Sequence, residues 1–180
     1  MSALELVRIG DIHPRWLEGI VGPLSRELGV TVTLHDGQLD RDAAYNAARA
    51  QYNSRVFLEM LDALPIDPLV RRLGVTNRDL YSSIFTFVFG EAHLGGRCGV
   101  ISLHRLRPEV YGLPADDGLT LQRAVKEAVH EAGHLWGAVH CREPGCVMNF
   151  SGVVEEIDLK GAQFCDSCRE SLRAGDPRGG

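Results

Sequence analysis

The residues best suited to chemistry lie in one run of the 180-residue chain, residues 130 to 140, which reads His-Glu-Ala-Gly-His-Leu-Trp-Gly-Ala-Val-His. On an α-helix, His130 and His134 share a face and lie about 6 Å apart along the axis. Two imidazoles so placed can bind one metal ion. Glu131 lies beside them and can act as a general base toward a water activated by that metal. The run therefore predicts a zinc site built for hydrolysis.

A third histidine, His140, tests this interpretation. On a continuous helix His140 would lie about 9 Å beyond His134, too far for a zinc bond of about 2 Å. The helix must therefore end between them, and Gly137 can supply the turn because glycine accepts positive φ. We predict that His130, His134 and His140 hold the catalytic zinc. The alternative, a surface helix that contains HExxH by chance, does not explain Gly137 and the third histidine in register.

Four of the five cysteines follow the histidines in two close pairs: Cys141 and Cys146, then Cys165 and Cys168. In a reducing compartment such clustering indicates metal rather than disulfides. The spacing is typical of a structural four-cysteine zinc site, although the first pair is wider than usual. Reduced core thiols are the alternative. A zinc ion here would fix both ends of the loop behind the active site.

Two further residues, Met148 and Cys98, need an interpretation. Met148, eight residues after His140, is expected to form an apolar floor beneath the imidazoles. Cys98 is interpreted as a small buried hydrophobe, and the alternative is that it reaches the catalytic metal as a gate.

The elements that must position these residues follow from hydrophobic periodicity. We predict a helix over 14–28, a strand over 30–34, a helix over 42–64 capped by Asp42, a buried strand over 79–89, a strand over 100–106, and a motif-carrying helix capped by Thr120. This order predicts an α/β or α+β fold. We expect a single domain over 1–180, with an N-terminal subdomain 1–137, a C-terminal subdomain 138–173 and a mobile tail 174–180.

Composition excludes several classes of protein. The 24 acidic residues outnumber the 19 basic ones and the net charge is −5, which argues against a nucleic-acid partner. No stretch has the length of a membrane helix, and the first residues lack an export signal. We therefore expect no membrane partner, a cytoplasmic location and a monomer.

The run from His130 to Cys141, followed by Cys146, Met148, Cys165 and Cys168, resembles the archaemetzincins, a family of metzincin zinc metallopeptidases. The gap from Met148 to the final cysteine pair is one residue shorter than the family pattern, which affects only a loop. Residues 85–92 and the strand that follows are similar to the family's sheet. The resemblance implies a metzincin-like fold: a twisted mixed sheet, a backing helix, an active-site helix and a small zinc-stapled C-terminal subdomain. It also implies two zinc ions per chain, one catalytic and one structural.

These observations predict a zinc-dependent metallopeptidase of narrow specificity, with Glu131 as the general base and a peptide or protein as substrate. An extended substrate is expected to pair with an exposed sheet edge contributed by residues 99–106. One alternative is a catalytically silent zinc-binding interaction protein on the same fold, which would have no use for Glu131 as a base. Another is a metallohydrolase that acts on something other than peptides.

Overall fold

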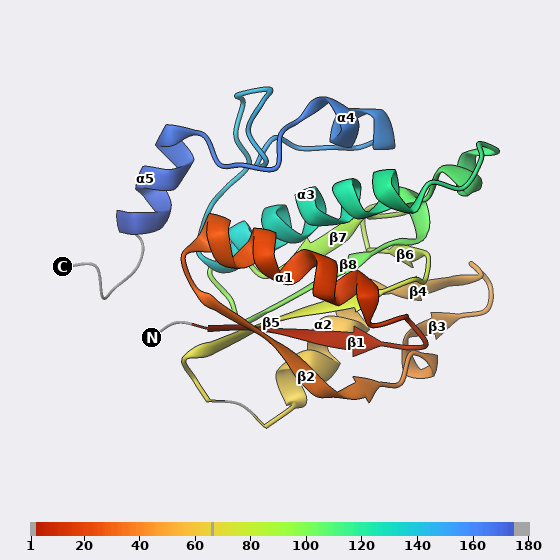
Figure 1. Ribbon diagram of the computed structural model, residues 1–180. Coiled ribbons are helices and arrows are strands. Elements are labelled where there is room, and N and C mark those ends of the chain that lie inside the picture. Colours follow the sequence, from red (N-terminus) through yellow and green to blue (C-terminus); the bar gives the residue numbers. More distant parts are fainter. Residues whose placement is uncertain (1–2, 66, 175–180) are drawn as a thin grey trace.

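The computed structural model of the chain describes residues 3–65 and 67–174. Its centre is a five-stranded sheet of order β2-β1-β5-β8-β7 (Figure 1). Four neighbouring strands are parallel, and β7 pairs antiparallel with β8. The strands are β1 (Ala3–Ile9), β2 (Thr31–Leu39), β5 (Val70–Thr76), β7 (Gly90–Ala92) and β8 (Cys98–Ser102). The short strand β7 is therefore one edge of a mixed sheet.

Helices cover both faces of this sheet. Helices α1 (Arg15–Leu28) and α3 (Asp117–Leu135) lie side by side on one face (Figure 1). Helix α2 (Ser54–Ala63) packs on the other face, against the buried side chains of Val7 and Ile9. The prediction of a mixed sheet with a backing helix and an active-site helix is thus confirmed. None of the described helices is long and apolar enough to cross a bilayer.

The chain after α3 forms a layer on the side of that helix away from the sheet (Figure 1). It contains α4 (Val154–Leu159) and α5 (Asp166–Ala174), joined by irregular segments. Val154, Ile157 and Phe164 bury their side chains in the same core as α1 and α3. Residues 175–180, most of the predicted tail, lie outside the described part of the chain.

Several predicted elements are confirmed. Helix α1 matches the prediction for 14–28, and its buried residues are Trp16, Leu17, Ile20 and Leu24. It ends at Gly29, which adopts a φ of 66°. The strand predicted over 30–34 exists and extends to Leu39. The strand predicted over 100–106 is β8, which ends at Ser102 before a short 3-10 helix over His104–Leu106.

The prediction of one helix over 42–64 is wrong in its first half. A 3-10 turn, Asp42–Ala44, leads into a hairpin of β3 (Tyr45–Asn46) and β4 (Gln51–Asn53). The rings of Tyr45 and Tyr52 pair across this hairpin at 5.1 Å, so their spacing reflects a cross-strand pair and not a helical face. The helix begins only at α2, where the side chain of Asn53 accepts a hydrogen bond from the amide of Arg55.

The buried strand predicted over 79–89 is also wrong. Only β6 (Leu80–Tyr81) is a strand, and the rest is an irregular segment. Ile84 is 81% exposed and Phe85 is 48% exposed, so the apolar run that predicted a core strand instead lines a cleft. The cap predicted at Thr120 lies one turn too late, because α3 is capped by Asp116, which accepts a hydrogen bond from the amide of Leu119 at 2.8 Å.

Candidate metal centres

Helix α3 carries His130 and His134 and ends where the sequence predicted. Gly137 follows with a φ of 90°, and its amide donates to the carbonyl of His134 at 2.9 Å. The chain reverses there and brings His140 back to the helix. The ligand nitrogens of the three histidines lie within 4.8 Å of one another. The turn at Gly137 therefore ends the helix and allows His140 to lie beside His130 and His134.

Backbone carbonyls fix the orientation of the two helical histidines. Nδ1 of His130 lies 2.8 Å from the carbonyl oxygen of Val147, and Nδ1 of His134 lies 2.7 Å from that of Ala138. A proton on each Nδ1 donates to these carbonyls, which leaves the Nε2 lone pairs free. The two Nε2 atoms face each other at 3.1 Å, an arrangement that a shared cation stabilises. The donor set fits zinc.

Burial keeps these imidazoles neutral, which is the form that binds a metal. It lowers the pKa of His130 well below the usual value, and the charge of Lys160 acts in the same direction. Burial likewise lowers the pKa values of His134 and His140. The ring of His140 lies 5.2 Å from that of Phe150 in an edge-to-face contact.

Glu131 lies beside this cluster and is 5% exposed. Burial raises its pKa well above the usual value, and the carboxylates of Glu127 and Glu91 add to the shift. A raised pKa makes a carboxylate a better proton acceptor. Met148 is buried, and a Cβ on Gly133 would meet its Sδ at 2.7 Å, so the methionine packs directly on α3 between the two histidines.

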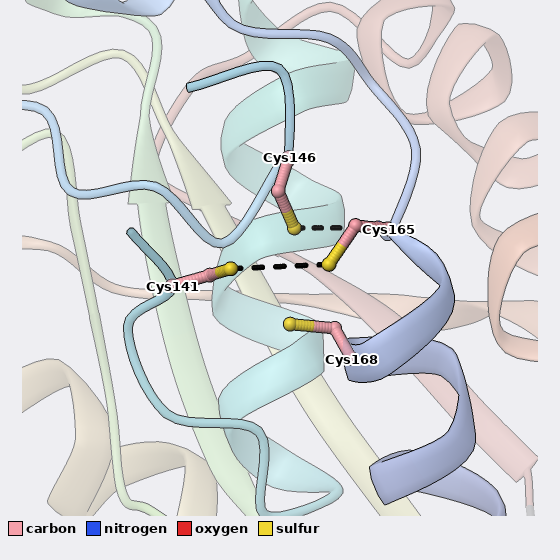
Figure 2. A group of neighbouring side chains, drawn as sticks. All are labelled: Cys141, Cys146, Cys165 and Cys168. Atoms are coloured by element: carbon pink, nitrogen blue, oxygen red, sulfur yellow. Dashed lines mark hydrogen bonds between the residues drawn. The ribbon is translucent and has the colours of Figure 1, made fainter. Parts of the chain in front are cut away.

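The four cysteines converge on one point (Figure 2). Cys141 and Cys146 come from the loop after α3, and Cys165 and Cys168 lie at the start of α5. The Sγ atoms of Cys141 and Cys165 are 3.8 Å apart, about the edge of a tetrahedron with Zn–S bonds of about 2.3 Å. The amide of Cys165 donates to Sγ of Cys146 at 3.4 Å, and the amide of Cys168 lowers the pKa of Cys165. The group fits a thiolate-bound zinc.

Cys98 belongs to neither cluster. It is buried with the residues that face α2, on the opposite side of the sheet from α3, and its Sγ lies 3.9 Å from Oδ1 of Asp62. Burial raises the pKa of this thiol to about 11. The interpretation as a buried hydrophobe agrees with this position, whereas the idea that Cys98 reaches the catalytic metal is wrong.

A cleft of about 550 Å³ opens over the histidines and Glu131. Residues 82–92 form one wall, and residues 150–152 contribute to the lining. The edge strand in this cleft is β7, because β8 lies inside the sheet between β5 and β7. The prediction that residues 99–106 offer the free edge is therefore wrong. The three histidines predicted from the sequence do cluster, whereas the strand predicted to form the free edge beside them is wrong.

Two residues that line this cleft were missed from the sequence, Glu127 and Lys160. Glu127 could have been found by helical spacing, because it lies four residues before Glu131 on the same face of α3. Lys160 follows α4, and no local pattern connects it to the motif.

Comparisons with known proteins agree with this geometry. The model of peptidase family M54 matches residues 27–174. The archaemetzincin of Pyrococcus horikoshii is 40% identical over 160 residues, which cover 87% of this chain and 85% of that protein. The crystal structure of archaemetzincin from Archaeoglobus fulgidus, complexed with malonate, has a TM-score of 0.80 at 36% identity, over 94% of this chain and 99% of that one. A zinc-dependent peptidase from Methanocorpusculum labreanum has a TM-score of 0.85 at 31% identity, over 94% and 99% of the two chains.

The fold, the clustered histidines and these relatives define the class of the protein as a zinc metallopeptidase. Within that class, the chain belongs to peptidase family M54, the archaemetzincins.

Proposed function

We propose that this peptidase hydrolyses peptide bonds at a zinc ion held by Nε2 of His130, Nε2 of His134 and the ring of His140, with Glu131 as the general base. The observation that carries the proposal is the pair of Nδ1 contacts to carbonyl oxygens, which turn two free Nε2 atoms toward each other beside a buried carboxylate. Zinc bound there supplies Lewis-acid chemistry, because it lowers the pKa of a water and polarises a carbonyl.

The protein's own residues perform the proton transfers. Glu131 accepts a proton from the attacking water and delivers it to the nitrogen of the leaving amine. Burial raises the pKa of this carboxyl group, which makes its carboxylate a better proton acceptor. The free edge of β7 binds an extended substrate through main-chain hydrogen bonds.

We propose a narrow specificity on the basis of the cleft walls. Side chains from outside the wall hold residues 82–92 in place: Gln51 and Arg49 donate to the carbonyl of Thr86 at 2.9 and 3.2 Å, and Arg105 lies over the ring of Phe87 at 4.2 Å. A wall fixed in this way admits an extended peptide more readily than a folded loop.

We propose a second, structural zinc ion on Cys141, Cys146, Cys165 and Cys168. It would staple residues 138–173 into a C-terminal subdomain behind the active site, and residues 1–137 would form the other subdomain of one domain. Four thiolate ligands suit a reducing compartment, which supports a cytoplasmic location. With a net charge of −5, a peptide is a better partner than nucleic acid, and we propose that the protein acts as a monomer.

The test is a cleavage screen with a peptide library at full zinc loading, beside a Glu131→Gln variant. The wild-type protein is expected to cleave a small subset of peptides. The variant is expected to keep both zinc ions and to lose about 100-fold or more in kcat, because a missing general base costs about that much. Turnover by the variant at the wild-type rate would refute the role of Glu131. A wild-type protein that holds both metals and cleaves no peptide would favour a catalytically silent zinc protein.

A further inference from the structure

A buried ion pair forms part of the cleft lining. Nζ of Lys160 lies 2.9 Å from Oε1 of Glu127, and the two side chains are 1% and 5% exposed. Charged side chains are rarely buried unless they are paired. Both residues nevertheless line the cleft that holds the histidines and Glu131. The pair is therefore shielded from bulk water and still adjoins the space that a substrate occupies.

The pair lines the same part of the cleft as Glu131. Glu127 and Glu131 are separated by one turn of α3, which is about 6 Å along the axis. Lys160 reaches the same place from the end of α4, where its Nζ also donates to the carbonyl of Asn149 at 3.3 Å. Glu127 lies on the far side of Glu131 from His134. A substrate side chain bound there belongs to a residue adjoining the bond that is cut.

Neither charged group has its hydrogen-bonding capacity filled. An ammonium group has three N–H donors, and within the described residues Nζ of Lys160 makes one directed hydrogen bond, to the carbonyl of Asn149. Oε1 of Glu127 is buried without a hydrogen-bond donor, because its contact with Nζ is close but poorly directed. The lining of the cleft therefore holds unfilled N–H donors on Lys160 and an unfilled acceptor on Glu127 side by side.

We propose that this pair binds the primary amide side chain of a substrate Gln or Asn, and this inference rests on the proposed function. An amide carbonyl oxygen accepts from Lys160, and the amide NH₂ donates to Glu127. A neutral amide matches a pair without net charge. A carboxylate would be repelled by Glu127 and Glu131, a cation would have to compete with Lys160 for Glu127, and an aliphatic side chain would leave both groups unfilled.

The direction of the sheet edge indicates which substrate residue binds to the Lys160–Glu127 pair. Strand β7 starts with Gly90 against Glu131 and leads toward the C-terminal end of α3, where the amide of Gly95 donates to the carbonyl of His134 at 2.8 Å. Antiparallel pairing is the commoner arrangement of strands. A substrate antiparallel to β7 runs from His134 toward Glu131 and Glu127. The Gln or Asn is then the residue that follows the cleaved bond.

Binding of peptide hydroxamates tests the proposal without requiring turnover. The hydroxamate anchors each ligand at the histidine-bound zinc, and the next residue is Gln, Glu, Lys or Met in otherwise identical compounds. Calorimetry on the zinc-loaded protein is expected to show that the Gln compound binds at least about 10-fold more tightly than the Met compound of similar shape. Equal affinities, or a preference for Glu, Lys or Met, would overturn the proposal.

A double variant separates recognition from stability. Lys160→Met with Glu127→Met removes both charges together, so that no unpaired charge stays buried. It is expected to abolish the preference for Gln over Met. The matched control is Arg123→Met with Asp158→Asn, which removes an ion pair of 2.6 Å that also joins α3 to α4 but does not line the cleft. The control is expected to keep the preference.

A preference for Gln that persists in the Lys160/Glu127 double variant would overturn the proposal. So would its loss in the Arg123/Asp158 control alone. If the double variant does not fold, the affinities of the four compounds for the wild-type protein still test the proposed preference for Gln. If no hydroxamate binds to protein with both metals present, the proposed zinc site fails first, and this inference fails with it.

Discussion

Gly90 and Glu131 approach each other so closely that no side chain fits between them. A Cβ on Gly90 would lie 2.6 Å from Cγ and 2.7 Å from Oε1 of Glu131, and 2.8 Å from the carbonyl oxygen of Val100. Real Cβ atoms do not come so near, so either the edge strand or the side chain of Glu131 would have to move. The absence of a side chain at Gly90 therefore allows Glu131 to lie directly against strand β7.

We predict that Gly90→Ala lowers kcat by about 100-fold, because a displacement of about 1 Å in a catalytic group costs that much. The control is Gly22→Ala, on the exposed side of α1, where a new Cβ meets nothing within 4 Å. That variant is expected to keep full activity and to gain about 0.5–1 kcal/mol of stability. Steady-state kinetics and metal content of both proteins check the prediction. Full activity of Gly90→Ala at normal zinc content would contradict it.

The clustering of the three histidines could be predicted from the sequence because its information is local. The spacing of His130 and His134 predicts that both lie on one face of a helix, and Gly137 predicts where that helix ends. Lys160 gave no comparable signal. It meets Glu127 only because α4 folds over α3, so its role depends on tertiary packing that no short pattern contains.

The same reasoning explains why the sequence failed to predict strand β5. Its Arg71-Arg72 pair is unlike a buried strand, yet Arg72 is 3% exposed. Its guanidinium pairs with Glu5 at 2.8 Å and donates to carbonyl oxygens at the end of α2 and beyond it. These partners lie far away in the sequence or are backbone atoms. The residues next to Arg72 therefore do not indicate that its charge has partners and can be buried in a strand. Residues 82–89 caused the opposite error. Their apolar side chains predicted a buried strand, but they form an irregular wall that faces a cleft.

Asp79 binds Arg105 and Gln51, two of the residues that hold the wall of the cleft in place. The free energy of unfolding should therefore depend on the charge of Asp79. Asp79 accepts two hydrogen bonds from Arg105, at 2.6 and 2.8 Å, and one from Gln51 at 3.0 Å. We predict that Asp79→Asn costs about 1.5–3 kcal/mol near neutral pH, since hydrogen bonds to charged groups contribute about that much. Chemical denaturation measures the difference. The control Glu59→Gln breaks an exposed pair with Arg55 and should change little.

The pH dependence of this difference has a definite sign. Burial alone would raise the pKa of Asp79, but its hydrogen bonds with Arg105 outweigh burial and the pKa is lowered. The carboxylate therefore stabilises the fold above the unfolded pKa of about 3.9, and this contribution is lost as pH falls through the lower folded value. The gap between wild type and Asp79→Asn should be constant from about pH 5 to 8 and close below about pH 4. A gap that persists in strong acid would point to packing instead of charge.

The four-cysteine group should contribute to stability through its metal. We predict that Cys168→Ser lowers the zinc content by one ion and costs about 3–5 kcal/mol, the range for loss of a structural element of this kind. At about 2–4 °C per kcal/mol, the melting temperature falls by roughly 10 °C. The control is Cys98→Ala, at a buried thiol far from both clusters, which should keep both ions and lose only about 1 kcal/mol. Unchanged zinc content and melting temperature in Cys168→Ser would reject the structural site.

The two proposed zinc ions should also differ in how firmly they are held. Four thiolates enclose an ion, whereas three neutral imidazoles leave a position open to water and to chelators. His140 adds to the difference, because it is exposed and lies beyond the turn at Gly137. When that turn relaxes, only the two histidines on α3 hold the ion. Dialysis against a chelator near neutral pH is therefore expected to leave a folded, inactive protein with one zinc ion.

Acid alone is a weaker route to the same state. Burial lowers the pKa values of all three histidines, so protons compete with zinc only below the usual value of about 6.5. The chelator experiment is checked by metal analysis together with circular dichroism, and added zinc should restore activity. A His140→Ala variant provides the matched control, since it should lose the same ion without any chelator and should not recover activity with zinc. Two ions retained by the wild-type protein after chelation, or loss of the fold before loss of activity, would contradict the predicted order.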